Sequence, residues 1–361
     1  MPHSDQIYSL IIYKLGEYSA KQMLKLKEFF GNFETAFFAS PKDWQEAKIS
    51  DRICNQNTAQ QKNIDPIIYF EKFTQNKIKI IDFHSPIYPQ LLKEISDPPY
   101  FLFCRGNVEL LNKNSLAIVG TRKITSYGRQ ILNSFVPQIV KNDFVIISGL
   151  AFGVDTMAHA ETVRNNGETI AVLGTAINQI YPAENKKLAE DILTKNGLII
   201  SEYPIDSLTQ KFSFAKRNRI ISGLCFGTLI IEAPLKSGSL ITAQCALDQN
   251  REVFCVPGSI FSQFSEGTNN LLKNGAQLIS NVEDIFENLQ TFTNSPKTNS
   301  PPYLPNDPIE ATILSNLTEN RHINELAQLC QISISELNAK LMVLEIKNAI
   351  LNLGNNIYIK K

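Results

Sequence analysis

Short apolar runs and glycine-containing loops alternate through the middle of the chain. The runs occupy residues 77–82, 101–105, 115–119, 145–148, 170–173, 198–201, 228–232 and 252–256. Between several of them lie segments with helical spacing, such as 127–141, where Ser126 is the expected cap, and 240–248. Buried strands that alternate with helices are typical of a parallel sheet covered on both faces. The pattern therefore predicts an α/β core, an extended Rossmann-like sheet, over residues 76–289.

The first 75 residues have helical spacing. The expected helix boundaries are Ser19, which can form a capping box with Gln22, Gly31 at a helix end, and Ser40 and Asp65, each followed by proline. We expect a small helical module over 1–75, similar to SAM or helix-hairpin-helix domains. Residues 14–19 fit the hairpin of the latter, but they lack its second glycine, so we favour a role in interaction or scaffolding.

Residues 290–308 are rich in Pro, Ser, Thr and Asn, a composition that is typical of a linker. Residues 309–361 then predict helices at 309–317 and 323–330, a third helix capped by Ser333, and a hairpin of 350–353 with 357–359. Three helices and a hairpin make a winged helix. Its third helix carries only Lys340 and Lys347 as cations, and 307–361 holds five basic and six acidic residues. We therefore favour a protein-contact or regulatory role over duplex DNA binding.

The overall charge excludes a generally basic protein. The 361 residues include 35 basic and 35 acidic ones, so any attraction to nucleic acid must come from a local patch. The six cysteines are scattered without a CxxC pair, and neither a signal peptide nor an apolar run of membrane-spanning length is visible. We expect a cytoplasmic protein with reduced cysteines, no metal and no cofactor.

One stretch, 211–223 (KFSFAKRNRIISG), combines cations with aromatic residues. It holds Lys211, Lys216, Arg217 and Arg219, with Phe212 and Phe214 among them. Such a mixture suits a ligand that has both phosphates and bases. The start of a helix with a solvated charged face explains the stretch, taken alone, equally well.

The loops after the predicted strands favour an anion. Parallel sheets bind ligands beyond the carboxyl ends of their strands, so these loops should converge. They contain backbone-exposing glycines and lead into helix N-termini, which suit phosphate: Gly120, Gly149, Gly153, Gly174 and Gly238. The loop cations Arg122 and Lys123 add positive charge. Because the chain has neither a GxxxxGK[ST] nor a GxGxxG motif after the first strand, ATP hydrolysis and dinucleotide binding are not indicated.

Candidate catalytic groups are sparse. Asp155 and His159 are four residues apart on one expected helix, where a structural pair is the favoured interpretation. Glu202 and Glu232 follow strands and either form a carboxylate pair or hold arginines in place. The sequence therefore gives no strong reason to expect an enzyme.

A series of motifs in the central region resembles the DprA/Smf family of DNA-processing proteins. They are LAIVGTRKITSYG, ISGLAFGVDTMAHAETVRNNGETIAVLGTAINQIYPAEN, IISEYP, FSFAKRNRIISGL, IIEAPLKSGSLITA and VPGSIFSQFSEGTNNLLKNGAQLI. The resemblance covers residues 78–286 in the family's order. It implies a non-enzymatic recombination mediator of natural transformation, which binds and protects incoming single-stranded DNA. It also implies work alongside single-strand-binding protein, loading of the RecA recombinase, and action as a homodimer.

The resemblance also implies site residues. Arg122 would grip a phosphate, while Lys211 and Phe214 would supply one phosphate contact and one base stack. The implied DNA-binding residues are Gly120, Thr121, Arg122, Ser148, Gly149, Gly153, Lys211, Phe214, Lys216, Arg217, Asn218, Arg219, Ser237 and Gly238. The family's dimer surface would include Leu271, Leu272 and Leu278, for which ordinary core packing is the alternative. Ala215 departs from the proline that the family often has.

Two other function classes stay open at this point. The first is a LOG-like nucleotide phosphoribohydrolase. Gly223, Gly227-Thr228 and Glu232 loosely resemble the glycine-rich loop and glutamate of that group, although its PGGxGT string is missing. The second is a scaffold that acts through its two end modules.

Overall fold

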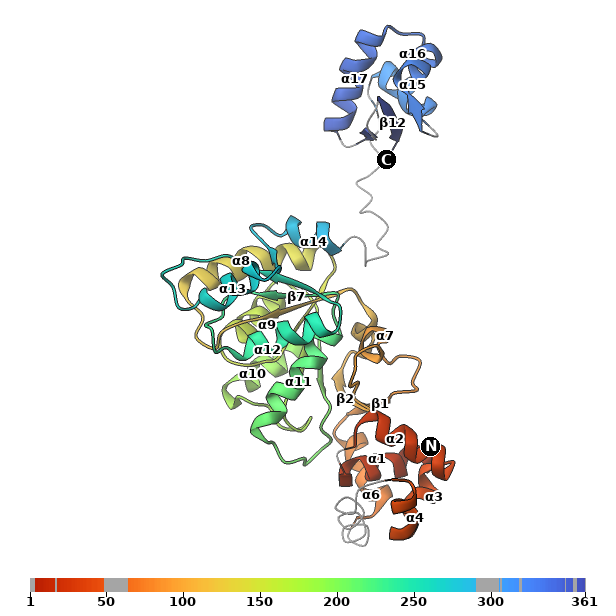
Figure 1. Ribbon diagram of the computed structural model, residues 1–361, viewed down its shortest axis with the longest axis vertical. Coiled ribbons are helices and arrows are strands. Elements are labelled where there is room, and N and C mark those ends of the chain that lie inside the picture. Colours follow the sequence, from red (N-terminus) through yellow and green to blue (C-terminus); the bar gives the residue numbers. More distant parts are fainter. Residues whose placement is uncertain are drawn as a thin grey trace. The chain divides into compact units, whose positions relative to one another are not determined.

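The computed structural model describes residues 4–16, 18–48, 64–289, 305, 307–317, 320–347, 349–352 and 356–360. The chain divides into two compact units, Met1–Thr293 and Asn294–Lys361. Figure 1 shows the ribbon of each unit, with labels on part of the elements. No helix among the described residues is long and apolar enough to cross a bilayer.

The first unit is built on a nine-stranded sheet with the strand order β1-β2-β6-β5-β4-β3-β7-β8-β9. Its strands are β1 (Lys79–Asp82), β2 (Phe101–Gly106), β3 (Ser115–Val119), β4 (Val145–Ser148), β5 (Thr169–Leu173), β6 (Leu198–Ser201), β7 (Gly227–Ile230), β8 (Glu252–Cys255) and β9 (Gln277–Leu278). The strands from β6 across to β9 pair in parallel, which confirms the expected α/β core. β1 and β2 are antiparallel, a direction that apolar runs do not encode.

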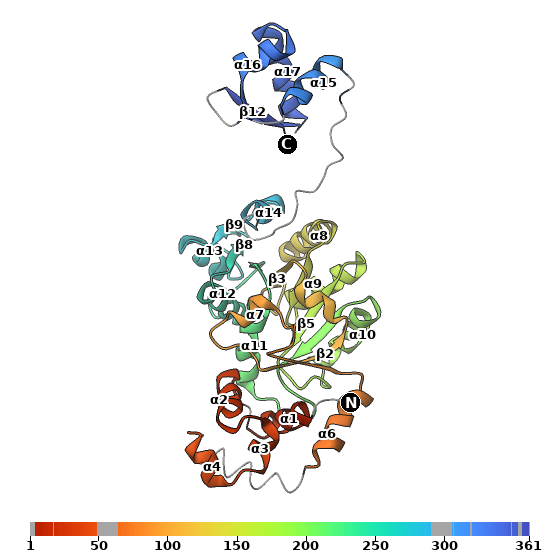
Figure 2. The ribbon, with the colours of Figure 1, turned by 90° about the vertical axis from the view of Figure 1, so that its right-hand side faces the viewer.

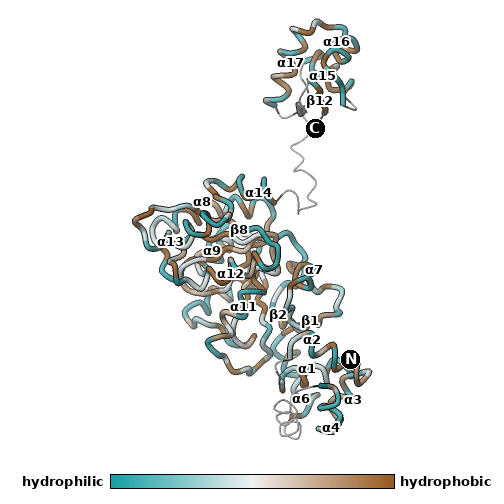
Figure 3. The backbone as a smooth tube through the Cα atoms, viewed as in Figure 1, coloured by the Kyte–Doolittle hydropathy of each residue, from teal (hydrophilic) through white to brown (hydrophobic). Residues whose placement is uncertain are grey.

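Helices cover both faces of this sheet. They are α7 (Gln90–Lys93), α8 (Ser126–Lys141), α9 (Val154–Arg164), α10 (Lys186–Thr194), α11 (Lys211–Gly223), α12 (Gly238–Asp248), α13 (Glu266–Lys273) and α14 (Glu283–Leu289), with 3-10 turns η1 (Val108–Asn112) and η2 (Ala183–Asn185). α11 and α12 pack on one face, and α8 and α9 pack on the other (Figure 2). This double cover explains why the central strands read as continuous apolar runs instead of alternating ones. In Figure 3 the backbone tube is coloured by hydropathy, and hydrophobic segments recur along this unit.

The N-terminal helices are part of this unit. They are α1 (Ser4–Gly16), α2 (Ala20–Phe30), α3 (Phe33–Phe38), α4 (Pro41–Glu46) and α6 (Pro66–Gln75). The predicted capping box of Ser19 with Gln22 and the stop at Gly31 are confirmed, as are the starts at Ser40 and Asp65. The buried residues of α1 and α6 belong to one hydrophobic core with β2 and β5, so these helices pack directly on the sheet.

The starts of α8 and α9 show two local features of the backbone. Thr125, not Ser126, caps α8, because its hydroxyl accepts from the N–H of Gly128. Serine and threonine are both favourable N-cap residues, so residue type alone does not decide which of the two neighbours caps the helix. α9 begins at Val154, where Gly153 stands before it with a φ of 79°, a conformation that favours glycine.

The second unit has the elements of a winged helix. These are α15 (Pro308–Asn316), β10 (Arg321–His322), α16 (Ile323–Cys330), α17 (Ile334–Ile346), β11 (Ile350–Asn352) and β12 (Ile357–Lys360). The three strands form one antiparallel sheet, in the order β10-β12-β11. Ser333 caps α17 as expected. The hairpin residues 353–355 and most of the expected linker 290–308 lie outside the described residues.

Candidate nucleic-acid interface

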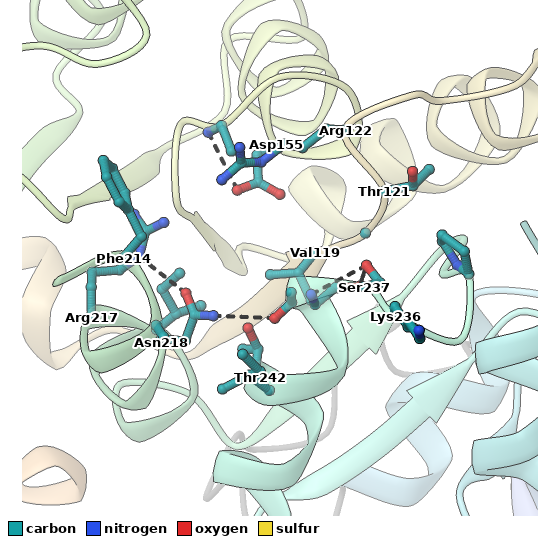
Figure 4. A pocket seen from close by; sticks show the side chains of 18 of the residues that line it. Val119, Thr121, Arg122, Asp155, Phe214, Arg217, Asn218, Lys236, Ser237 and Thr242 are labelled. Atoms are coloured by element: carbon teal, nitrogen blue, oxygen red, sulfur yellow. Dashed lines mark hydrogen bonds between the residues drawn. The ribbon is translucent and has the colours of Figure 1, made fainter. Parts of the chain in front are cut away.

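A cavity of about 460 Å³ opens where the strand order of the sheet reverses. From β3 the chain continues to β4 on one side of it, and β7 later pairs on the other side. The loops that follow β3 and β7 therefore separate at the carboxyl edge and leave a crevice, which is the place where open α/β sheets bind ligands. Figure 4 shows this cavity with side chains from both loops and from α11 and α12.

Many of the predicted DNA-binding residues meet in this cavity. Its lining includes Gly120, Thr121, Arg122, Lys211, Phe214, Arg217, Asn218, Ser237 and Gly238. They come from four separate segments, namely the β3–α8 loop, α11, the β7–α12 loop and the start of α12. On α11, Lys211, Phe214 and Asn218 follow each other at steps of three and four residues, which places them along one side of the helix.

Arg217 is a buried cation that ties strand ends together. Its Nη1 donates to the carbonyl oxygen of Gly149 at 2.8 Å and to that of Val172, and its Nε donates to Oδ1 of Asn218 at 3.2 Å. Burial lowers the pKa of Arg217 to about 10, although the carboxylate of Asp155 opposes this shift. Arg217 thus organises the floor of the cavity, and only 5% of it is exposed.

Arg219 and Lys216 do not line the cavity. Arg219 Nη2 lies 2.5 Å from Oε1 of Glu202, and its Nε donates to Asp97 at 3.1 Å. Lys216 Nζ lies 3.6 Å from the same Glu202 oxygen. Glu202 therefore holds these two cations, which settles its open role in favour of an arginine holder. Glu202 lies at the start of the loop that leads into α11, too far from these cations in sequence for a local pattern to reveal the ion pairs.

Three other predicted residues, Ser148, Gly149 and Gly153, have packing contacts near the cavity, and Gly149 also lines a smaller hollow beside it. Ser148 is fully buried, and its hydroxyl donates to the carbonyl oxygen of Ile118 at 2.6 Å. A Cβ at Gly149 would stand 2.5 Å from Arg217, and one at Gly153 would stand 2.3 Å from the carbonyl oxygen of Thr121. These glycines allow the loops around the cavity to approach closely.

The cavity also has lining residues that the sequence interpretation did not assign. They are Asp155, Lys236, Ser239 and Thr242, together with apolar neighbours. Asp155 accepts from the N–H groups of Gly149 and Ala151, and burial raises its pKa to about 6. The expected pair with His159 is not seen among these contacts, because the Nδ1 of His159 is 2.7 Å from the Thr169 hydroxyl. Lys236 could have been predicted as a cavity residue, because it is a cation in the loop that follows β7.

A cluster of aromatic rings borders the cavity. Phe152, Tyr181 and Phe214 line a smaller hollow together with Arg122. The rings of Tyr181 and Phe214 have centroids 5.2 Å apart with a tilt of 47°, and Tyr181 is 50% exposed. Aromatic residues in the loops that follow β4 and β5 were the signal that could have identified Phe152 and Tyr181 from the sequence.

The remaining candidates are separate from the cavity. Glu232 is 2% exposed, and its oxygens accept hydrogen bonds from the N–H and the hydroxyl of Thr125. The carboxylate that a LOG-like phosphoribohydrolase would use is therefore bonded within the protein. Leu271 and Leu272 are partly buried against the core. Leu278 is 54% exposed on the edge strand β9.

Fold and site together define a class: a Rossmann-like protein with a cationic, aromatic-edged cavity at its strand-order reversal, joined to a winged helix. Comparison with known proteins narrows this class. Residues 79–290 match the DNA recombination-mediator protein A family, and residues 296–356 match the DprA winged helix domain. The chain belongs to the DprA/Smf family of DNA recombination-mediator proteins, as its motifs predicted.

Individual relatives agree with this assignment. DNA processing protein DprA of Bacillus subtilis is 45% identical over 60% of this chain and 73% of its own length. Protein Smf of Synechocystis is 36% identical over 80% of this chain and 74% of its own length. Among solved structures, DprA of Streptococcus pneumoniae has a TM-score of 0.69 at 33% identity, covering 80% of this chain and 98% of that one.

A second solved structure concerns DNA processing protein A of Helicobacter pylori, reported for its single-stranded DNA binding mode. It has a TM-score of 0.54 at 34% identity, and it covers 60% of this chain and 97% of its own.

Proposed function

We propose that this protein binds single-stranded DNA across the cavity at the β3–β7 reversal. The observation that carries the proposal is the convergence of Arg122, Lys211 and Lys236 around one cavity. All three side chains are exposed, and none is within ion-pair distance of a carboxylate in the described part of the chain. Exposed cations without carboxylate partners are available to phosphates. The single-stranded DNA binding of the Helicobacter relative supports the same reading.

Base stacking supports a single strand over a duplex. Phe214, Tyr181 and Phe152 offer ring surface beside Arg122. Bases present their flat faces only when they are unpaired, and such stacking is tolerant of sequence. Gly238, the first residue of α12, also lines the cavity and brings the N-terminus of that helix to it.

The deciding experiment is a titration of the full chain with labelled single-stranded and duplex oligonucleotides at two salt concentrations. We expect preference for the single strand and a loss of affinity with salt, with a logarithmic slope of about −0.7 for each phosphate contact. The Arg122→Ala, Lys211→Ala double variant should bind much more weakly and keep its melting temperature. Equal binding by the double variant and the parent would refute the site.

We further propose that the bound strand is protected and passed to the RecA recombinase in the presence of single-strand-binding protein, during natural transformation in the cytoplasm. Family membership supports this role, in which the protein is a non-enzymatic homodimer.

The exposed Leu278 on edge strand β9 supports a dimer contact there. Leu278→Arg should convert the dimer to a monomer in sedimentation. RecA filament formation on DNA covered by single-strand-binding protein should require the wild-type chain.

For the winged helix we propose a protein-contact or regulatory role. The two lysines expected on the third helix contact carboxylates of the same unit. Lys340 of α17 contacts Asp307, and Lys347, the residue that follows α17, lies 3.0 Å from Glu310. Cations engaged in this way contribute little to phosphate binding. Replacing both lysines by alanine in the full chain should leave duplex affinity unchanged, whereas a clear loss would favour duplex recognition by α17.

A further inference from the structure

The N-terminal helices hold the loop that leads into α11. This loop, residues 202–210, joins β6 to the first cavity-lining residue of the helix, Lys211. The Tyr13 hydroxyl on α1 donates to the carbonyl oxygen of Glu202 at 3.1 Å. The Tyr69 hydroxyl on α6 donates to the carbonyl oxygen of Ile205, also at 3.1 Å. Two elements that lie far away in sequence therefore attach to one loop.

Lysines from the same helices reinforce these attachments. Lys14 Nζ donates to the carbonyl oxygen of Ile205 at 3.3 Å, and Lys72 Nζ lies 3.6 Å from the carboxylate of Asp206. The four contacts fall within five residues of the loop, at Glu202, Ile205 and Asp206. A concentration of this kind fixes the path of the backbone more firmly than scattered packing contacts would.

The two tyrosines are dependable donors. Each is only 5% exposed, and burial raises the pKa of both hydroxyls above the usual range for tyrosine. Both hydroxyls therefore stay protonated at neutral pH and keep donating. Loss of either oxygen would leave a buried backbone carbonyl with one partner fewer.

Glu202 carries this attachment directly to the helix. Its carbonyl oxygen is held by Tyr13, while its carboxylate binds Arg219 and Lys216 of α11. Lys211 and Phe214 lie on the same helix and line the cavity. The contacts thus form a continuous path from α1 through Glu202 to α11 and the proposed DNA site.

We propose that Tyr13 and Tyr69 are positioning residues, through which the N-terminal helices set the placement of Lys211 and Phe214 for single-stranded DNA. The inference rests on the proposed function of the cavity. It assigns the N-terminal helices a role inside the DNA site, beyond that of an attached interaction module. Neither tyrosine touches the strand itself.

The test uses Tyr13→Phe and Tyr69→Phe, which remove one oxygen and keep the ring. We expect each to weaken single-stranded DNA binding by about three- to tenfold, the equivalent of one hydrogen bond. Tyr88→Phe is the matched control, because the Tyr88 hydroxyl is also buried and donates to a backbone carbonyl, that of Pro99, outside the loop. Its DNA affinity should equal that of the wild type.

Double-mutant cycles separate positioning from general stability. In a Lys211→Ala background the penalty of Tyr13→Phe should shrink, because the group that it positions is gone. In a Lys236→Ala background it should persist in full, because Lys236 lies on the β7–α12 loop and not on α11. Equal penalties in both backgrounds would mean a merely structural tyrosine and would overturn the inference.

The outcomes also distinguish the two proposals. A wild-type chain that binds no single-stranded DNA would remove the proposed function, and the inference with it. If the wild type binds and Lys211→Ala weakens binding, but both tyrosine variants bind like the wild type, the function stands and the positioning role fails. Tyr69→Phe provides an independent second variant if Tyr13→Phe lowers the melting temperature.

Discussion

Two lysines on one helix provide a direct test of the DNA site. Lys211 lines the cavity, whereas Lys216, five residues later on α11, lies 3.6 Å from Glu202 and outside the lining. The two substitutions remove the same charge from the same helix. Lys216→Ala also removes the contact with Glu202, but Arg219 still joins α11 to that carboxylate. Lys216→Ala is therefore a control for the net charge of the helix.

The expected magnitudes follow from one phosphate contact. A hydrogen bond to a charged group contributes about 1.5–3 kcal/mol, which corresponds to a loss of about ten- to 150-fold for Lys211→Ala. The slope of logarithmic affinity against logarithmic salt should become shallower by about 0.7. When salt is raised from about 50 mM to about 200 mM, the ratio of wild-type affinity to Lys211→Ala affinity should therefore fall by about 2.6-fold. Lys216→Ala should keep both affinity and slope to within about twofold.

Fluorescence anisotropy with a labelled single-stranded oligonucleotide, recorded at both salt concentrations, measures both quantities. Equal losses for the two variants would show that α11 acts only through its net charge, and the proposed geometry would be refuted. A loss at Lys211 with an unchanged salt slope would also contradict a phosphate contact there.

Three further outcomes are expected. Burial raises the pKa of Asp155 to about 6, above its value in the unfolded chain, so the folded wild type loses stability as pH rises from about 4 to about 6. Asp155→Asn should lack this slope in denaturant melts recorded across that range, and a parallel pH profile would contradict the assignment. Gly153→Ala should lower stability by more than about 1 kcal/mol in calorimetry, because φ is 79° and the new Cβ meets the Thr121 carbonyl at 2.3 Å. Tyr181→Ala should weaken single-stranded binding by about 1–3 kcal/mol with little change for duplex, while Tyr181→Phe binds like wild type; equal losses in both variants would exclude stacking.

Much of the fold could be predicted from local patterns. The apolar runs at β3, β4 and β6 have the predicted bounds, because a strand buried on both faces needs only apolar residues in succession. The caps at Ser19 and Ser333 were also visible, since capping depends on residues three positions apart. The antiparallel direction of β1 and β2 was not visible, because pairing partners are chosen by the whole sheet.

The candidate site was predictable to a similar degree. Lys211, Phe214 and Arg122 were identified by residue type and motif, and the structure brings them to one cavity. Local sequence does not distinguish these cations from Arg219, whose carboxylate partners lie 17 and 122 residues away. Long-range pairing of this kind decides which charges of a basic stretch remain available to a ligand, and only the folded chain contains that information.

The carboxylates of α15 have a consequence for how this architecture can change. Asp307 and Glu310 engage Lys340 of α17 and Lys347, which follows it. Residues 307–361 carry a net charge of −1, from five basic and six acidic residues. Asp307→Asn with Glu310→Gln would bring that balance to +1, and asparagine would still serve as the cap of α15. Two substitutions outside α17 would thus remove the negative charges that engage Lys340 and Lys347. Family members that share this fold need not share an affinity for duplex DNA, and the difference would be found on α15 instead of α17.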